Sequence, residues 1–406
     1  MLAVACGVGV STIYFPQALI PLVASGLRVS TAAAALIATA AQVGYAAGIF
    51  LLVPLGDRVR NRPLIVTLLV LTGLCLLVAG AAPSLPVLIV AGGLAGFTTV
   101  VPQIIIPMAA GLVDPARRGA VTGTLLSGLI AGILLARTFS GSLGEWLGWR
   151  APYIAAAGFV LLLAVVLLRV VPRTTPSSTQ TYPALLGTAV RLFATQPALR
   201  RSCLYQALVF GGFSAAWTSI SLLIDSSTYR MGAEVVGLIA LVGAGSVFAT
   251  PVAGRAADRR GSDAVNLVCL VTTLAAAAVL TLGGVGGVAG MAALLIGMLL
   301  LDVAMQSGQV ANQARIFGID PGLRARLNTA YMTCAFAGGS VGSWLGVRAY
   351  LAFGWAGVCG LVALAAGIAL VRHVAHLAAV RSGPVTAPED APVASGAGAV
   401  RAAIDS

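Results

Sequence analysis

Two long apolar segments of this chain end at the same kind of charged turn. Residues 51–62 read Leu-Leu-Val-Pro-Leu-Gly-Asp-Arg-Val-Arg-Asn-Arg, and residues 254–261 read Gly-Arg-Ala-Ala-Asp-Arg-Arg-Gly. In each copy a glycine lies thirteen residues before the aspartate, Gly44 before Asp57 and Gly245 before Asp258. A repeated unit of apolar segment, charged turn and apolar segment is typical of a protein with two similar halves embedded in a membrane.

The composition places most of the chain in lipid. Hydrophobic residues make up 59% of its 406 residues and charged residues only 9%, against about 25% charged residues in a soluble domain. Apolar runs of about 20 residues, long enough to cross a bilayer, follow one another with short breaks. Backbone polar groups in lipid must be hydrogen-bonded within the protein, so each run should form a helix. The runs do not alternate in polarity, which disfavours a transmembrane barrel.

We expect an all-α integral membrane protein with twelve membrane-spanning helices in two six-helix repeats. The spans cover about residues 3–24, 33–56, 64–81, 85–112, 119–142, 151–171, 202–224, 234–256, 264–283, 288–312, 325–348 and 353–373. The first six form an N-terminal bundle over residues 1–171, and the last six form a C-terminal bundle over residues 201–373. Residues 172–200 form a cytoplasmic linker. Residues 374–406, rich in Pro, Ala and Gly, are expected to be a disordered cytoplasmic tail.

The positive charges indicate how the chain is oriented. All 24 are arginines; the predicted breaks place nineteen on one side of the membrane and four on the other, and Arg137 falls within a span. Positive residues are enriched in cytoplasmic loops, so the arginine-rich side and both termini should be cytoplasmic. The net charge of +12 then reflects topology, and we expect no nucleic-acid partner. We expect a multi-pass, lipid-embedded monomer of the inner or plasma membrane.

Shorter matches support an internal duplication. Asp114-Pro115-x-x-Arg118 recurs as Asp320-Pro321-x-x-Arg324, and Gly148-Trp149 recurs as Gly354-Trp355, both at an offset of 206 residues. Two matches in one register indicate two six-helix halves repeated in parallel.

The charged turns resemble the signature G-x-L-a-D-R-x-G-R-R of the major facilitator superfamily. The first copy matches it at Leu55, Gly56, Asp57, Arg58, Arg60 and Arg62, but Val53 and Arg60 replace its two glycines. The second copy is closer, with Gly254, Asp258, Arg259, Arg260 and Gly261. The resemblance covers residues 3–372 and implies transport of a small molecule by a site that opens to each side in turn. Within the superfamily the chain is similar to twelve-span drug:proton antiporters of bacteria.

The resemblance implies a gating role for the charges of the two turns. The residues concerned are Asp57, Arg58, Arg62, Asp258, Arg259 and Arg260. Carboxylates near helix N-termini and arginines near C-termini are each stabilised by about 0.3–1 kcal/mol, and opening the cytoplasmic mouth would break such contacts. The alternative is that these charges only anchor the helix ends in the lipid headgroups.

Asp302 is the one acidic residue that falls near the middle of a predicted span. An aspartate there costs about 2.5–3.5 kcal/mol on insertion scales, so it usually faces a cavity. Desolvation favours its protonated form, which lets it bind a proton on one side and release it on the other. We therefore predict that Asp302 couples transport to protons, with a buried structural aspartate as the alternative. Gln306, Gln309 and Gln313 continue its helical stripe and predict a cavity wall.

Other polar or aromatic residues within the spans are candidates for the same cavity. They are Tyr14, Gln17, Gln42, Gln103, Gln206 and Trp217. The resemblance implies that the first, fourth, seventh and tenth spans line this cavity. For each residue the alternative is a hydrogen bond between helices.

Arg137 lies where antiporters of the family carry the pattern G-x-x-x-G-P-x-x-G-G. Here Ala136, Arg137 and Ser140 replace Gly, Pro and Gly. An arginine at this position either binds an anionic group or extends to the outer membrane interface. Counted from the predicted span ends, Arg137 and Asp302 differ in depth by about 13 Å, so we expect them not to pair.

These patterns predict a secondary active transporter that exports a small, drug-like molecule in exchange for protons. The alternatives are a facilitator or importer of a sugar or metabolite on the same fold, and a receptor or sensor that transports nothing. We expect no enzymatic activity, no cofactor and no metal site. Without a lysine the chain has no nucleotide-binding phosphate loop, which excludes ATP as the driving force.

Overall fold

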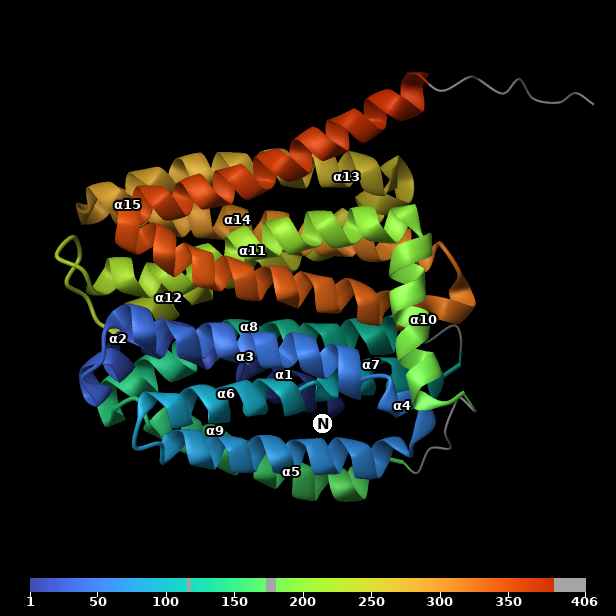
Figure 1. The fold of residues 1–406 in the computed structure, drawn as a ribbon, viewed down its shortest axis with the longest axis horizontal. Coiled ribbons are helices and arrows are strands. Elements are labelled where there is room, and N and C mark those ends of the chain that lie inside the picture. The colour runs from blue at the N-terminus through green and yellow to red at the C-terminus, as the bar shows by residue number, and fades with distance from the viewer. Residues whose placement is uncertain (115–117, 173–179, 383–406) are drawn as a thin grey trace, which may run out of the picture. The chain divides into compact units, whose positions relative to one another are not determined.

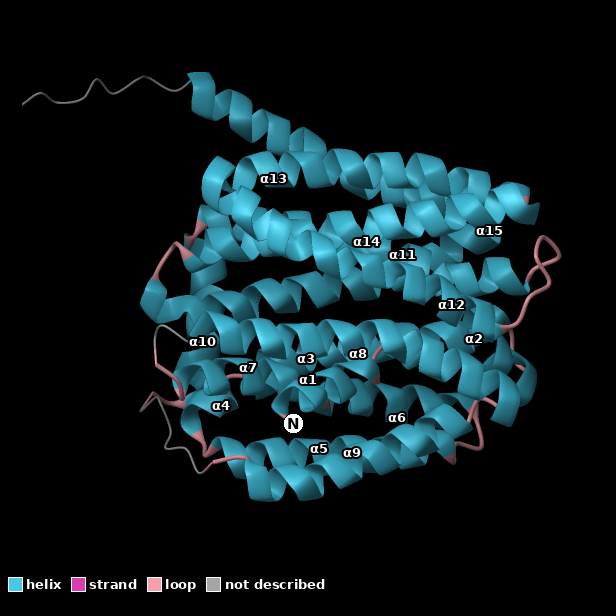
Figure 2. Ribbon diagram, turned by 180° about the vertical axis from the view of Figure 1, so that it is seen from behind, coloured by secondary structure: helices cyan, strands magenta, loops and turns pink. Residues whose placement is uncertain are grey.

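The computed structural model describes residues 1–114, 118–172 and 180–382, and within these ranges the chain forms helices joined by short turns and no strand (Figure 2). Packing groups Met1–Leu370 as one unit and Val371–Ser406 as a second. The account below concerns the first unit, together with the course of the last helix.

The described residues of the first part of the chain form nine α-helices (Figure 1). They are α1 (Leu2–Ser11), α2 (Phe15–Leu27), α3 (Thr31–Leu52), α4 (Leu55–Arg58), α5 (Asn61–Gly80), α6 (Leu85–Thr98), α7 (Val101–Gly111), α8 (Arg118–Leu147) and α9 (Ala151–Val170). The pairs α1 with α8, α3 with α6 and α5 with α9 pack side by side.

The second part begins with α10 and ends with the long α15. Its elements are α10 (Tyr182–Thr195), α11 (Pro197–Asp225), α12 (Ala233–Gly243), η2 (Ala244–Phe248), α13 (Ala249–Thr281), η3 (Leu282–Val285), α14 (Gly287–Phe317), η4 (Pro321–Leu323) and α15 (Arg324–Ser382). Helix α10 runs along one end of the longer helices, and the turn between α11 and α12 lies at the other end (Figure 1). We name these the α10 end and the α11–α12 end.

The described helices agree with the predicted membrane fold. Ten of them are long and apolar enough to span a bilayer, and the apolar segment Ala233–Gly243 is shorter. The segment Arg324–Ala379 contains a break at Gly354, where φ is 63°, so it accounts for two predicted spans. Helix α13 breaks in the same way at Gly261, where φ is 81°. The all-α membrane fold is confirmed, and these elements are consistent with twelve spans.

Close helix contacts repeat in the two halves. A side-chain carbon added to Gly7 of α1 would lie 2.5 Å from the backbone oxygen of Gly128 of α8. In the second half, one added to Gly342 of α15 would lie 2.0 Å from the oxygen of Gly211 of α11. Glycines of this kind let membrane helices approach closely, and their recurrence in equivalent helix pairs supports the duplication.

The two halves touch through α8 and α12. Gly237 of α12 lies against α8, because an added side-chain carbon would come 2.7 Å from the Cα of Thr138. Thr138 Oγ1 also donates a 2.8 Å hydrogen bond to the Gly237 carbonyl oxygen. Nearer the α11–α12 end, Gly141 packs in the same way on the carbonyl oxygen of Ala233. Small residues therefore form the contact between the halves at this end.

Two helices of the first half are interrupted at the same level. The α1–α2 pair breaks at Thr12, and the α6–α7 pair breaks at Thr99. Pro16 and Pro102 follow these breaks in the first turns of α2 and α7, where a missing N–H is tolerated. The hydroxyls of Thr12 and Thr99 are 3.3 Å apart and hydrogen-bonded, so the two interruptions are joined.

Parts of the expected linker and tail are helical, and only the helix in the tail departs from the expectation. Helix α10 occupies the second part of the linker. Helix α15 continues to Ser382, so residues 374–382 of the expected tail are helical. This segment has no glycine or proline to stop the helix, whereas Gly383-Pro384 follows it directly. Residues 383–406 lie outside the described part of the chain.

Candidate functional site

Arg137 is the centre of the candidate site. Its side chain is 0% exposed in the middle of α8. The Nε atom donates a 2.8 Å hydrogen bond to Oε1 of Gln17 on α2. Nη1 and Nη2 have no hydrogen-bond partner among the described residues. The guanidinium is thus buried with only one of its three nitrogens bonded, so Arg137 does not extend to a membrane interface.

Aromatic rings enclose this guanidinium. Its Cζ atom lies 4.0 Å from the ring centre of Trp217, 4.8 Å from that of Tyr14 and 5.8 Å from that of Phe213. Trp217 and Phe213 come from α11 of the second half, and Tyr14 lies in the turn between α1 and α2. Ring faces attract a cation, and they do so more strongly where water is excluded. The cage therefore stabilises a positive charge from the first half by rings from both halves.

Asp302 belongs to the same cluster. It is 2% exposed on α14, and its carboxylate lies against Gly243 at the end of α12. A side-chain carbon added to Gly243 would come 2.5 Å from Oδ2, so the glycine makes room for the carboxylate. The indole Nε1 of Trp217 lies near this carboxylate without reaching hydrogen-bond geometry. Trp217 thus turns its face to Arg137 and its edge to Asp302.

Arg137 and Asp302 form no ion pair, as expected, but they lie closer together than their predicted depths indicated, since Arg137 stacks on Trp217 and Asp302 lies against Gly243 beside the same ring. Their charges interact, although no ion pair within 4.0 Å joins them in the described structure. The error lies in the predicted end of the fifth span. Helix α8 continues to Leu147 rather than to about residue 142, so Arg137 lies ten residues from its end. At about 1.5 Å per residue, Arg137 is about 7 Å deeper than predicted.

Several predicted cavity residues instead bond helices to one another. Gln103 donates to the hydroxyl of Tyr45 at 3.3 Å, and the hydroxyl of Tyr331 donates to Gln206 at 2.9 Å. Gln313 donates to Asn328 at 3.2 Å, which links α14 to α15. The alternative of interhelical hydrogen bonds fits these three residues. Gln306 and Gln309 are half-buried on α14, and Gln42 is fully buried on α3.

The residues predicted to form the gate lie at the α10 end. Asp57, Arg58 and Arg62 belong to α4 and the start of α5. Asp258, Arg259 and Arg260 are exposed on α13, just before the break at Gly261. Their gating role stays a prediction.

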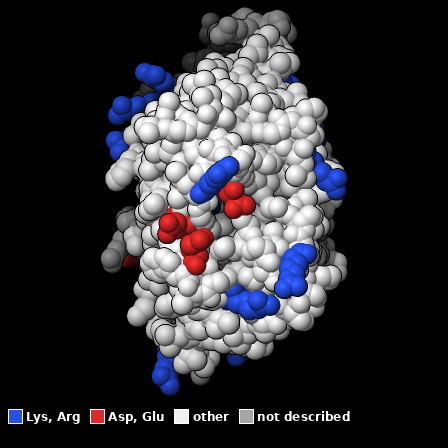
Figure 3. Space-filling view, turned by 90° about the vertical axis from the view of Figure 1, so that its left-hand side faces the viewer, with Lys and Arg blue, Asp and Glu red and all other residues white. Residues whose placement is uncertain are grey.

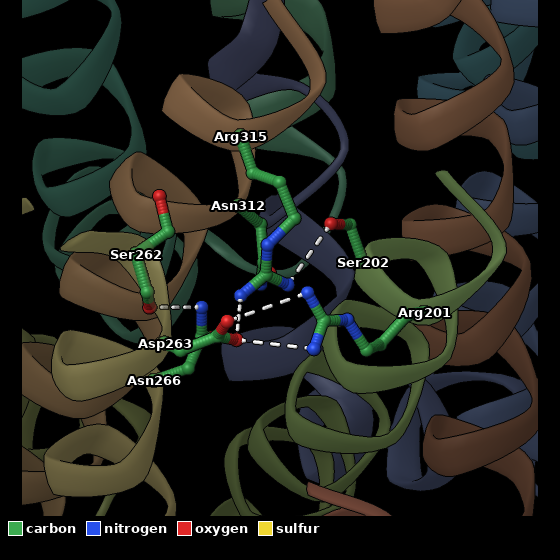
Figure 4. Close-up of polar contacts among 7 residues, drawn as sticks. All are labelled: Arg201, Ser202, Ser262, Asp263, Asn266, Asn312 and Arg315. Carbon is green, nitrogen blue, oxygen red and sulfur yellow. Dashed lines mark hydrogen bonds and ion pairs between the residues drawn. The ribbon is translucent and has the colours of Figure 1, made fainter. Parts of the chain in front are cut away.

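A charged cluster at this same end was not foreseen from the sequence. Asp263 of α13 accepts from Arg315 of α14 and lies 3.3 Å from Arg201 of α11 (Figure 4). Arg315 also donates to Ser202 at 3.4 Å and to Asn312 at 3.5 Å. The cluster joins three helices of one half. The sequence signal was an aspartate five residues after Asp258, but its partners are 52 and 62 residues away along the chain.

The α11–α12 end carries acidic side chains near its centre. Figure 3 views this end and shows acidic side chains gathered near its centre beside a small hollow, with one basic side chain next to them and others further out. The hollow is lined by Glu145 of α8 and Asp225 of α11, among others. Glu145 Oε2 accepts a 3.1 Å hydrogen bond from the backbone N–H of Ala233, at the start of α12. This carboxylate adds a polar contact between the halves next to the glycine contacts.

Comparison with known proteins identifies the family. The sequence profile described as Major Facilitator Superfamily matches residues 1–343. The chain is 37% identical over 359 residues to a protein of Escherichia coli O157:H7 named as the uncharacterized transporter YgaY, covering 88% of this chain and 90% of that protein. It is 33% identical over 360 residues to the Streptomyces coelicolor protein named as transporter SCO4007, covering 88% and 83%.

A solved structure shows the same fold. The crystal structure of the nucleoside transporter NupG superposes with a TM-score of 0.70 at 13% identity, covering 92% of this chain and 99% of that one. Because the relatives and this fold are those of transporters, the prediction that the chain is not an enzyme is confirmed. The chain is therefore a multi-pass membrane protein that belongs to the Major Facilitator Superfamily of transporters.

Proposed function

We propose that this chain moves a small molecule through the Arg137–Asp302 site and that Asp302 carries a coupling proton. The single observation that supports this most is a buried carboxylate and a buried guanidinium from opposite halves around one tryptophan. Ionisable groups inside a membrane protein are expensive and usually serve transport or binding. A structural pair would be expected to form direct hydrogen bonds, and Arg137 and Asp302 do not.

The proposed movement is a rocking of two bundles, residues 1–171 and 201–373, about this site. The glycine contacts between α8 and α12 hold the halves together at the α11–α12 end, which we place outside the cell, with both termini cytoplasmic. Opening on that side requires these contacts to separate. The charged turns at the α10 end, with Asp57 and Asp258, are proposed to close the cytoplasmic side in the alternate state.

The proton moves by a simple sequence. When the site faces the side with more protons, Asp302 takes one proton from water; when it faces the other side, the carboxyl releases it. Burial favours the neutral acid and Arg137 favours the carboxylate, so the two effects oppose each other. A group balanced in this way changes protonation when the nearby charge or hydration changes, as happens when the halves move.

The proton and the molecule can be coupled in two ways, by exchange or by transport in the same direction. Export of a drug-like molecule in exchange for protons is supported by the overall similarity to drug:proton antiporters, although Ala136, Arg137 and Ser140 depart from their pattern in the fifth span. Transport of the molecule together with the proton is favoured by one observation, the buried Arg137, whose charge attracts an anionic molecule most when Asp302 is neutral.

Proteoliposomes test both forms. The purified protein is reconstituted with a trapped pH-sensitive dye, and either chloramphenicol, a neutral drug, or benzenesulfonate, a permanent anion, is added outside. Exchange makes the lumen more alkaline as the probe enters, whereas cotransport makes it more acidic. Asp302→Asn is expected to abolish either proton movement, and Glu234→Gln, which neutralises an exposed carboxylate of α12, is the matched control. Undiminished proton movement in Asp302→Asn would refute the coupling role.

A further inference from the structure

We infer that the molecule bound at this site is a small organic monoanion, held by Arg137, and that it enters together with the proton on Asp302. This deepens the proposed function and rests on it for the transport step. The inference concerns the chemical class of the ligand, which is set by the hydrogen-bonding groups, charges and rings of the cluster.

Hydrogen-bond donors outnumber acceptors in the cluster. A guanidinium has five N–H groups, and the four on Nη1 and Nη2 of Arg137 have no partner among the described residues. Nε2 of Gln17 adds two more N–H groups without a partner there, because the amide uses only its oxygen to bind Arg137. The corresponding acceptor is Oδ2 of Asp302. A ligand that satisfies the surplus N–H groups must bring acceptor oxygens, as a carboxylate or sulfonate does.

The charges and rings argue against a cationic ligand. The ring faces of Trp217, Tyr14 and Phe213 would suit a cation, but the guanidinium of Arg137 already occupies them. A second cation would be placed beside a buried positive charge. The edges of these rings and the nearby ring of Phe210, stacked 5.6 Å from Phe213, leave apolar surface for an organic body attached to the anionic group.

Proton binding to Asp302 follows because the ligand anion and the Asp302 carboxylate compete for the positive charge of Arg137. An anion that binds the guanidinium displaces the Asp302 carboxylate from its counter-charge. A buried carboxylate without a counter-charge binds a proton, which comes from the water on the side to which the site is open. Arg137 from α8 and Tyr14 from the α1–α2 turn are the titratable groups that interact with Asp302. Among the described residues, Trp217 and Gly243 also lie beside the Asp302 carboxylate, and neither titrates.

Reciprocity then fixes the sign of the pH effect. If anion binding promotes protonation of Asp302, protonation promotes anion binding by the same factor. Affinity for a permanent anion should therefore rise as the pH falls. The bound proton offsets the charge of the bound anion, so the loaded site has the same net charge as the empty site. Proton and anion therefore cross the membrane together without moving net charge.

Calorimetry on the purified full-length protein tests the ligand class. The probes are benzenesulfonate, an anion at every pH used, and benzenesulfonamide, its neutral analogue of similar shape. Wild type is expected to bind the sulfonate at least about tenfold more tightly than the sulfonamide. Arg137→Gln should remove this preference, and Arg137→Lys, which keeps the charge but loses the planar fork, should weaken it several-fold.

Arg150→Gln is the matched control. Arg150 also stacks on a tryptophan, with its Cζ 4.1 Å from the Trp149 ring centre, but it is exposed in the turn before α9. It should leave sulfonate binding unchanged. Equal binding of the two probes by wild type, no binding of the sulfonate, or undiminished preference in Arg137→Gln would overturn the inference. If Arg137→Gln does not fold, the comparison of probes on wild type and on Arg137→Lys still decides.

Proton uptake is measured by repeating the titration in two buffers with different ionisation heats. At a pH where Asp302 is ionised in the free protein, wild type should take up as much as one proton per sulfonate bound, whereas Asp302→Asn should bind the sulfonate and take up none. Sulfonate binding without proton uptake in wild type would overturn the paired entry. Proton-coupled chloramphenicol flux without sulfonate binding refutes this inference alone, and sulfonate binding without flux of any probe refutes the proposed function alone.

Discussion

The molecule holds two groups of charges that differ in almost every physical respect. Asp263 and its two arginines belong to one half, lie at the α10 end, and make direct contacts while Asp263 stays 37% exposed. Arg137 and Asp302 belong to different halves, are almost fully buried, and leave polar atoms without partners in the described structure. The charges at the α10 end form direct ion pairs, whereas no ion pair within 4.0 Å joins Arg137 to Asp302 in the described structure.

This difference distinguishes the Asp263 cluster, which holds helices of one half together, from the Arg137–Asp302 site, which is proposed to take part in transport. Charges that pair within one half stabilise that half in every state of a rocking transporter, because their distances do not change. Charges that face each other across the halves change their surroundings each time the halves move. Full pairing of Arg137 with Asp302 would stabilise one state and oppose movement, so the unbonded nitrogens of Arg137 are consistent with a group that must be available to a ligand.

Removal of one central charge should have the largest effect. Arg137→Gln leaves a buried Asp302 without its counter-charge, a change that costs about 3–5 kcal/mol for a buried pair. We expect proton-coupled flux in proteoliposomes to fall by about 100-fold or more. The double variant Arg137→Gln/Asp302→Asn should recover thermal stability but not coupled flux. Recovery of both would mean that the two charges only hold the structure.

Added bulk between the halves should have the next largest effect. Gly237→Ala forces a side-chain carbon to 2.7 Å from the α8 backbone, and overpacking costs about 1–3 kcal/mol. The α11–α12 end should therefore be open more often, which is measured as faster labelling of a cysteine introduced at Ser221. Gly123→Ala on α8, which meets nothing within 4 Å, is the control. Equal labelling in both variants would show that this contact does not set the conformational equilibrium.

Loss of the exposed cluster should have a smaller effect, on stability alone. Asp263→Asn removes charge–charge attraction to Arg201 and Arg315, which are 12% and 9% exposed. We expect a loss of about 1 kcal/mol, a shift of about 2 °C in the midpoint of thermal unfolding in detergent. Flux should stay within about twofold of wild type. A tenfold loss of flux at unchanged stability would show that the Asp263 cluster takes part in transport and does not only stabilise one half.

The smallest effect on stability is expected at the charged turns. Asp258→Asn and Asp57→Asn each remove a carboxylate near a helix end, an interaction of about 0.3–1 kcal/mol. We expect flux to change less than about fivefold, with a shift in cysteine accessibility toward a more open α10 end. Glu234→Gln, an exposed carboxylate at the opposite end, should change neither quantity. Unchanged accessibility in both turn variants would leave these aspartates as anchors of helix ends.

The sequence predicted the fold well because membrane helices are encoded locally. A run of apolar residues of sufficient length is visible without any knowledge of its neighbours. Asp302 and Arg137 were visible for the same reason, since a charge in an apolar run stands out. Their proximity was not, because it depends on how far α8 extends, and Gly144 and Glu145, which suggest an end near residue 142, lie within the helix.

Pairing between distant helices was the part that the sequence did not show. In the sequence, Asp263 is only one more acid after the second charged turn, and no local pattern connects it to Arg201 or Arg315. In the same way, nothing near Gln103 or Gln206 distinguishes a residue that bonds a tyrosine from one that faces a ligand. Such partners follow from helix rotation and register, which packing sets.

The hydrogen bond between Thr12 and Thr99 has a mechanical consequence. It lies where α1 meets α2 and where α6 meets α7, so two helix interruptions of the first half are joined to each other. A tilt of α2 relative to α1 must then be accompanied by a tilt of α7 relative to α6. Tyr14 lies two residues after Thr12. The first half can therefore bend at both helix breaks together, close to the proposed ligand site. Such bending can occur in addition to a rigid-body rotation of the whole bundle.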